Sequence, residues 1–141
     1  MTDPAAPAPT TARPGAPLLP VYRVVLSLFL LAGAVQIFLA GFGVWGGHFD
    51  AHRILGFTMA GIAVVVLVLA LVTRAGTRDV VLAVVLVLLT GGAQSLLAEA
   101  GGSGAFWGGL HALDGLAIIG IAGFLHGAAI RRGRAAAVTP R

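Results

Sequence analysis

Four long runs of apolar residues occupy most of this 141-residue sequence. They cover residues 21–44, 51–73, 80–98 and 106–130. A helix needs about 20 mostly apolar residues to cross the hydrocarbon core of a bilayer, and lipid offers no partner for an open strand edge. The runs therefore predict an all-α fold, an integral membrane four-helix bundle in contact with the lipid bilayer.

The overall composition agrees with a membrane protein and excludes several other classes. Hydrophobic residues make up 58% of the chain and charged residues 10%, whereas soluble domains contain about 25% charged residues. The chain has no cysteine, so it has no disulfide, zinc–thiolate or iron–sulfur chemistry of its own. Its net charge of +4 comes from arginines at the ends of the apolar runs. Because they do not form one basic stripe, nucleic acid is not an expected partner.

The positions of the arginines predict how the helices cross the membrane. Cytoplasmic segments of membrane proteins carry an excess of basic residues. Eight of the nine arginines fall before the first run, between the second and third, or after the fourth: Arg13, Arg23, Arg74, Arg78, Arg131, Arg132, Arg134 and Arg141. Arg53 is the exception. We therefore predict a multi-pass protein of the cell membrane with both termini in the cytoplasm.

The two ends of the chain are predicted to lie outside the helical domain of residues 21–132. Residues 1–20 contain six of the seven prolines and are expected to form a disordered cytoplasmic tail. Residues 133–141 are expected to form a basic cytoplasmic tail. The first apolar run is too long for the hydrophobic region of a cleaved signal peptide and ends without a cleavage site, so we expect no such peptide.

The chain contains an internal repeat. His52 is followed four residues later by Gly56, and His111 by Gly115, which places the second pair 59 residues after the first. The only two glutamines, Gln36 and Gln94, are 58 residues apart. Such self-similarity is typical of a duplicated supersecondary unit. We predict two tandem helical hairpins related by an axis along the membrane normal, with the second and fourth helices diagonal to one another.

The repeat predicts a site in which His52 and His111 face each other at equal depth, near the outer side of the membrane. Ionisable groups at membrane depth are costly, which makes each a candidate for function. Two neutral imidazoles satisfy both axial positions of a haem iron. The sequence therefore suggests one b-type haem between them, with Gly56 and Gly115 leaving room for the porphyrin.

Neighbouring polar residues complete this hypothesis. Arg53 is expected to pair with a haem propionate. Asp114 is expected to fix the tautomer of His111, as outer carboxylates do for metal-bound histidines. Gln36 and Gln94 are expected to hydrogen-bond between helices or to line the same cavity. Such a protein would pass electrons to a membrane quinone or a redox partner, or would handle haem.

Two other interpretations remain open from the residues alone. In the first, the histidines are interfacial and the glycines serve helix packing, so the chain is a non-catalytic subunit or scaffold without cofactor. In the second, the acidic residues and histidines of the outer side serve a proton- or metal-coupled transporter. His48 and His126 are interpreted as interfacial in every case. No nucleophile triad can be assembled, so no catalytic residue is predicted.

Two resemblances rest on the residues around these motifs. The segments at 36–41, 50–56 and 110–116 look like a family of small four-helix actinobacterial membrane proteins known only as a domain of unknown function. That likeness covers residues 21–132 and implies no activity. The His52–Arg53 pair and His111 are also similar to one half of the haem A synthase family. This second resemblance implies a haem held by histidines of the second and fourth helices.

The chain departs from the haem A synthase pattern in two ways. That family has eight helices and two haem sites, whereas this chain has four apolar runs and one histidine pair. The family also carries a glutamate three residues before its first histidine, where this chain has Phe49. The resemblance therefore implies haem binding without oxidation of a haem methyl group.

Overall fold

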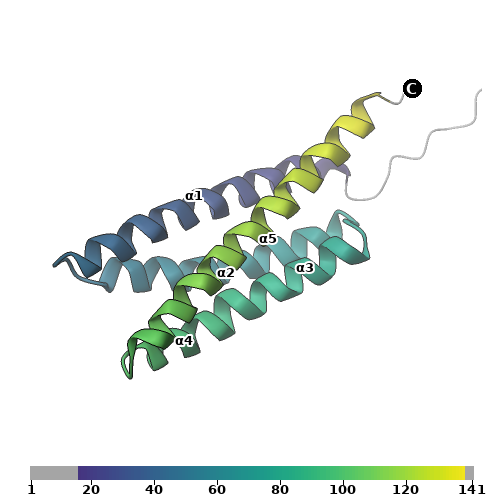
Figure 1. The fold of residues 1–141 in the computed structure, drawn as a ribbon. Coiled ribbons are helices and arrows are strands. Elements are labelled where there is room, and N and C mark those ends of the chain that lie inside the picture. The colour runs from purple at the N-terminus through teal and green to yellow at the C-terminus, as the bar shows by residue number, and fades with distance from the viewer. Residues whose placement is uncertain (1–15, 139–141) are drawn as a thin grey trace, which may run out of the picture.

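The structure, a computed structural model, describes residues 16–138, and these residues form helices joined by short connections (Figure 1). Their order is a 3-10 turn (Ala16–Leu18), α1 (Leu19–Val44), α2 (Asp50–Val72), α3 (Thr77–Val87), a π-helical turn (Leu88–Ala93), α4 (Gln94–Gly101) and α5 (Ala105–Val138). Helix α3, the π-helical turn and α4 form one span, so four helices are long and apolar enough to cross a membrane. The predicted all-α four-helix bundle is confirmed.

Helices extend beyond the predicted bounds at both ends of the described chain. Residues 16–20, predicted as tail, are helical, and Pro20 lies in the first turn of α1, where its missing N–H leaves no hydrogen bond unmade. Helix α5 continues to Val138 because its alanine-rich end favours helix. Residues 1–15 and 139–141, the rest of the predicted tails, lie outside the described residues.

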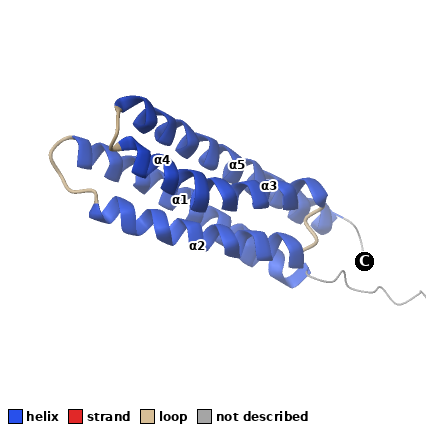
Figure 2. Ribbon diagram, turned by 90° about the horizontal axis from the view of Figure 1, so that it is seen from below, coloured by secondary structure: helices blue, strands red, loops and turns tan. Residues whose placement is uncertain are grey.

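The spans run up and down, so their connections alternate between the two ends of the bundle (Figure 2). The connections of residues 45–49 and 102–104 lie at one end, which we call the histidine end because His52 and His111 are near it. The connection of residues 73–76, with Gly76 at φ +94°, lies at the other end, together with the start of α1 and the end of α5. We call this the closed end.

Burial repeats along the chain as the internal repeat predicts. In α2 the most buried side chains include Met59, Ala63, Val66 and Ala70, and in α5 they are Ile118, Ala122, Leu125 and Ala129. Each residue of the second set follows its counterpart by 59 positions, the spacing that separates His52 from His111. The two hairpins therefore turn equivalent faces toward one core.

Contacts between the helices place α2 and α5 on a diagonal, as predicted. Helix α1 packs against α2 and α5, and α3 packs against the same two helices. The hairpins approach closely midway along the bundle, where a Cβ added to Gly33 would lie 3.1 Å from Cγ1 of Ile119. Toward the histidine end the second hairpin continues as α4 packed on α5.

A polar cluster joins the hairpins at the closed end. Asp79 in the first turn of α3 pairs with Arg132 of α5, with 3.6 Å between Oδ2 and Nη2. The guanidinium carbon of Arg132 lies 5.5 Å from the ring centroid of the fully buried Tyr22 of α1. Nearby in the same half, Ser27 and His126 are linked through Oγ and Nε2 at 3.0 Å. These contacts hold α1, α3 and α5 together away from the histidines.

Candidate functional site: a cleft between two histidines

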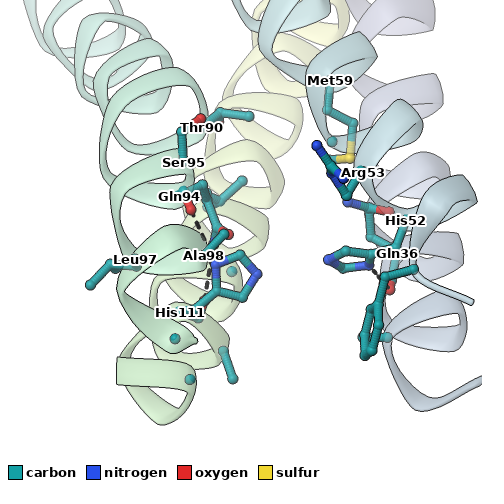
Figure 3. Close-up of a pocket in the computed structure, with 18 of the residues that line it drawn as sticks. Gln36, His52, Arg53, Met59, Thr90, Gln94, Ser95, Leu97, Ala98 and His111 are labelled. Carbon is teal, nitrogen blue, oxygen red and sulfur yellow. Dashed lines mark hydrogen bonds between the residues drawn. The ribbon is translucent and has the colours of Figure 1, made fainter. Parts of the chain in front are cut away.

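A cleft of about 1270 Å³ separates the two hairpins at the histidine end (Figure 3). One wall comes from α1 and α2 and the other from α4 and α5, and most of the lining side chains are apolar. Polar lining residues come from both walls: Gln36, His52, Arg53, Thr90, Gln94, Ser95, Glu99 and His111. The cleft is larger than the roughly 300–1,000 Å³ typical of sites for drug-sized ligands.

His52 and His111 point toward each other across this cleft (Figure 3). Their ring centroids are 6.0 Å apart and the ring planes are tilted by 57°. The edge of the Phe49 ring packs against His52, with 6.1 Å between ring centroids. The sequence prediction that the two histidines share one site is therefore matched by their positions in the fold.

Each histidine is held by the preceding helix of its own hairpin. Nδ1 of His52 lies 3.2 Å from the main-chain oxygen of Gln36, and Nδ1 of His111 lies 3.2 Å from that of Gln94. A carbonyl oxygen only accepts, so Nδ1 carries the proton and donates in both contacts. In a neutral imidazole Nε2 then keeps its lone pair free. The two walls thus present equivalent imidazoles in the same tautomer.

The glycines of the repeat make room for the two glutamine side chains. A Cβ on Gly56 would lie 3.2 Å from Nε2 of Gln36, and one on Gly115 would lie 3.4 Å from Nε2 of Gln94. Nε2 of Gln94 also donates to the main-chain oxygen of His111 at 3.0 Å. Gly56 and Gly115 both line the cleft, so they serve the glutamines in addition to the open space expected from the sequence.

Asp114 does not have the role predicted for it. Nδ1 of His111 donates its proton to the Gln94 main-chain oxygen, 3.2 Å away on the preceding helix, so that oxygen and not the Asp114 carboxylate holds the ring. The buried Oδ2 of Asp114 has no hydrogen-bond partner among the described residues. Asp114 also lies outside the lining of the cleft.

Arg53 lines the cleft on the wall of His52, and its side chain is exposed (Figure 3). Among residues 16–138 the ion pairs do not include Arg53, so its charge is available to an anionic group in the cleft. Glu99 lines the opposite wall. Gln36 adds a buried Oε1 that has no hydrogen-bond partner within the described chain.

The other two histidines lie away from this pair. His48 is exposed in the connection before α2. His126 follows His111 by 15 residues in α5, roughly 22 Å along the helix, and is linked to Ser27. Within residues 16–138 no three histidine, cysteine or acidic side chains gather as a metal site would require. The two-histidine site is therefore unlike a zinc site, which uses three or four protein ligands.

Three features of the site and its supports were not predicted from the sequence. The main-chain oxygens of Gln36 and Gln94 orient the histidines, a role that leaves no side-chain signal. The π-helical turn before Gln94 leaves only a weak signal, the change of repeat spacing from 59 to 58. The Asp79–Arg132 pair had a clearer signal, since among residues 16–138 Asp79 is the one acidic residue in the segments that carry the arginines of the closed end.

Comparison with known proteins adds no assignment to this geometry. The chain matches no protein-family model, no curated protein and no solved structure. The function is therefore argued from the fold and the cleft alone.

Proposed function

We propose that this integral membrane protein binds one b-type haem in the cleft, with His52 and His111 as the two axial ligands. The observation that carries the proposal is the facing pair of imidazoles, 6.0 Å apart between ring centroids, each with Nδ1 directed to a carbonyl oxygen. That hydrogen bond is the usual partner of a metal-ligating histidine, because it fixes the ring and leaves the other nitrogen free.

The spacing of the rings suits a metal ion between them. A bond from an imidazole nitrogen to a transition metal is about 2 Å, and the ring centre lies roughly 1 Å further back. Two imidazoles on opposite sides of one iron therefore have centroids roughly 6 Å apart, close to the 6.0 Å found here.

The number of donors favours haem over a bare metal ion. Two protein ligands do not close a zinc site, whereas a porphyrin supplies four equatorial nitrogens and needs only two axial ligands. Arg53, which has no ion pair among residues 16–138, would pair with a propionate. Oε1 of Gln36, which has no hydrogen-bond partner in the same range, would accept a hydrogen bond from a group or water in the cleft. When bound, the haem supplies one-electron chemistry, to be exchanged with a membrane quinone or a protein redox partner.

The chain's own residues set the conditions for this chemistry. His52 and His111, each tethered at Nδ1 by a main-chain oxygen, would hold the haem from both walls of the cleft. The apolar ring of Phe49 packs against His52 nearly at right angles. These features favour electron transfer or haem handling over oxidation of a substrate, and no catalytic residue is proposed.

The direct test is a visible spectrum of the purified protein. The chain is expressed with haem supplied, purified in mild detergent, and measured reduced minus oxidised. We expect sharp low-spin bands and about one haem per chain. A well-folded preparation that contains no haem, even after reconstitution with hemin, would instead favour the cofactor-free scaffold.

We further propose that the histidine end faces outward in the cell membrane, with the closed end in the cytoplasm. The chain has no cysteine, so single cysteines can be placed at His48, Gly104 and Ala75 without other thiols. In intact cells a membrane-impermeant maleimide is expected to label the first two positions and not the third, which becomes reactive after permeabilisation. Labelling of Ala75→Cys alone in intact cells would reverse the orientation.

A further inference from the structure

The second hairpin contains a π-helical turn that the first hairpin lacks. It covers Leu88–Ala93, and the main-chain N–H of Gln94 bonds back to the oxygen of Leu89, five residues earlier. Helix α1 runs from Leu19 to Val44 without such a turn. A π-helical turn adds one residue to an α-helix, and such turns are frequent at functional sites.

The buried faces of the two helices reveal what the extra residue does. From the start of α3 into the π-helical turn, four residues are buried that each follow a buried counterpart in α1 by 57 positions: Asp79, Ala83, Leu86 and Thr90, after Tyr22, Leu26, Phe29 and Gly33. At the cleft the spacing is 58, between Gln36 and Gln94. The register therefore shifts by one residue between Thr90 and Gln94, within or at the edge of the π-helical turn.

This shift limits the 58-residue spacing to the part of the repeat near the glutamines. Extended back by three residues, that spacing would pair Gly33 with Gly91, but Gly33 is buried and Gly91 is exposed. Thr90 occupies the place of Gly33 in the structure. Gln36 lies three residues after Gly33, so in a regular α-helix the residue three after Thr90, Ala93, would occupy the equivalent place beside His111.

We infer that the π-helical turn is the positioning element of the second half of the cleft: its one additional residue brings Gln94, instead of Ala93, against His111 and Gly115. Gln94 there makes contacts that alanine lacks, since its Nε2 donates to the His111 main-chain oxygen and lies against Gly115. The claim that the turn positions a haem ligand rests on the proposed function. The claim that the turn places Gln94 beside His111 does not.

The local sequence supports a widened turn at this place. Gly91 and Gly92 favour α-helix less than other residues, by about 1 kcal/mol each relative to alanine. Hydroxyl groups bond to main-chain oxygens on both sides of the glycines, with Thr90 Oγ1 at 2.7 Å from Leu86 O and Ser95 Oγ at 2.9 Å from Gly91 O. Such bonds compete with the regular helical pattern and bend helices.

Changes of length in this turn test the inference without any need for haem. Cysteine pairs are introduced into the cysteine-free chain by combining Gly115→Cys with Ala93→Cys, Gln94→Cys or Ser95→Cys, and a short bifunctional thiol reagent is applied. The pair Gln36→Cys with Gly56→Cys in the first hairpin is the positive control. In the unaltered chain we expect cross-linking from position 94, measured by mass spectrometry of the digested protein.

Two length variants then give opposite expectations. After deletion of Gly92, Gln94 is three residues from Thr90, as Gln36 is from Gly33, so position 94 should still cross-link. After insertion of one alanine following Gly92, the cross-link should move to position 93. The inference is overturned if deletion moves the cross-link to position 95, or if insertion leaves it at position 94 in a monodisperse protein.

Haem retention provides the second measurement. The deletion chain should hold haem as the parent does, within about twofold, with the same band positions. The insertion chain and Gln94→Leu should both retain it about tenfold less well, the scale of losing a contact to a metal ligand. If no chain binds haem, the proposed function fails and the cross-links still decide the inference. Equal retention by the parent and insertion chains would show that the turn does not position the ligand.

Discussion

Replacing His52 or His111 with alanine is expected to abolish the low-spin haem bands of the purified protein. Each imidazole would supply one axial ligand, and no other histidine, cysteine or acidic group gathers with the pair to replace it among residues 16–138. Loss of an outer hydrogen bond to a metal ligand costs about 10- to 100-fold in affinity, so loss of the ligand itself should exceed that range. The measurement is haem content per chain, with the reduced-minus-oxidised spectrum.

The remaining histidines provide matched controls for this experiment. His48 is exposed in a connection, and His126 lies in the other half of α5, bonded to Ser27. His48→Ala and His126→Ala should therefore leave the bands unchanged. Because both site histidines lie at the cleft, away from the closed end, their alanine variants should remain folded and monodisperse. If the bands survive in both site variants and disappear in His126→Ala, the haem ligand lies in the other half of the bundle and the proposed site is wrong.

The second large effect is expected at the closed end, where Asp79→Ala should lower the free energy of unfolding by about 3 kcal/mol. Asp79 is buried and pairs with Arg132, whose side chain is 27% exposed. Nε and Nη2 of Arg132 are buried and make no hydrogen bond within the described chain, so removal of the carboxylate leaves this guanidinium without its ion-pair partner. A buried charge without a partner costs more free energy than the intact ion pair contributes to stability. The largest loss of stability is therefore expected when only one partner of the pair is removed.

A double variant separates the contribution of the Asp79–Arg132 attraction from the cost of burying an unpaired charge. Asp79→Ala combined with Arg132→Met removes both charges, so it should recover most of the stability lost in Asp79→Ala. Thermal unfolding of the three proteins in one detergent gives the comparison. Arg132 is 21 residues beyond His111 in α5, about 30 Å along the helix, so haem content at low temperature should not change. A double variant less stable than Asp79→Ala would contradict this account of the pair.

The main elements of the fold follow from the sequence because a membrane allows few alternatives. Apolar runs long enough to span predict helices, since lipid does not satisfy a main chain outside a helix or a closed barrel. The predicted run at residues 51–73 corresponds to α2, Asp50–Val72. The 59-residue spacing of His52 and His111 likewise predicts that α2 and α5 are equivalent helices of the repeat. The burial of Met59 and of Ile118, 59 residues later, confirms this equivalence. Helix ends are less constrained by lipid, and α5 extends past residue 130.

The sequence predicted which residues line the candidate site but not the hydrogen bonds between them. His52, His111, Gln36, Gln94 and Arg53 were all selected from the sequence, and all line one cleft. Asp114 was given the role of orienting His111, yet a main-chain oxygen performs it. Every residue has a main-chain oxygen, so sequence carries no signal for which one a side chain reaches.

The sequence by itself determined the number of helices, which helices are equivalent in the repeat, and which two histidines lie at the same end of the bundle. These properties depend on composition and spacing along the chain, which lipid and helix geometry convert directly into structure. Only the tertiary structure decided that the imidazoles are 6.0 Å apart, that each donates from Nδ1, and that a π-helical turn brings Gln94 to the cleft. Such details depend on how two hairpins pack and on a one-residue shift in register, and packing joins residues that are distant in the chain.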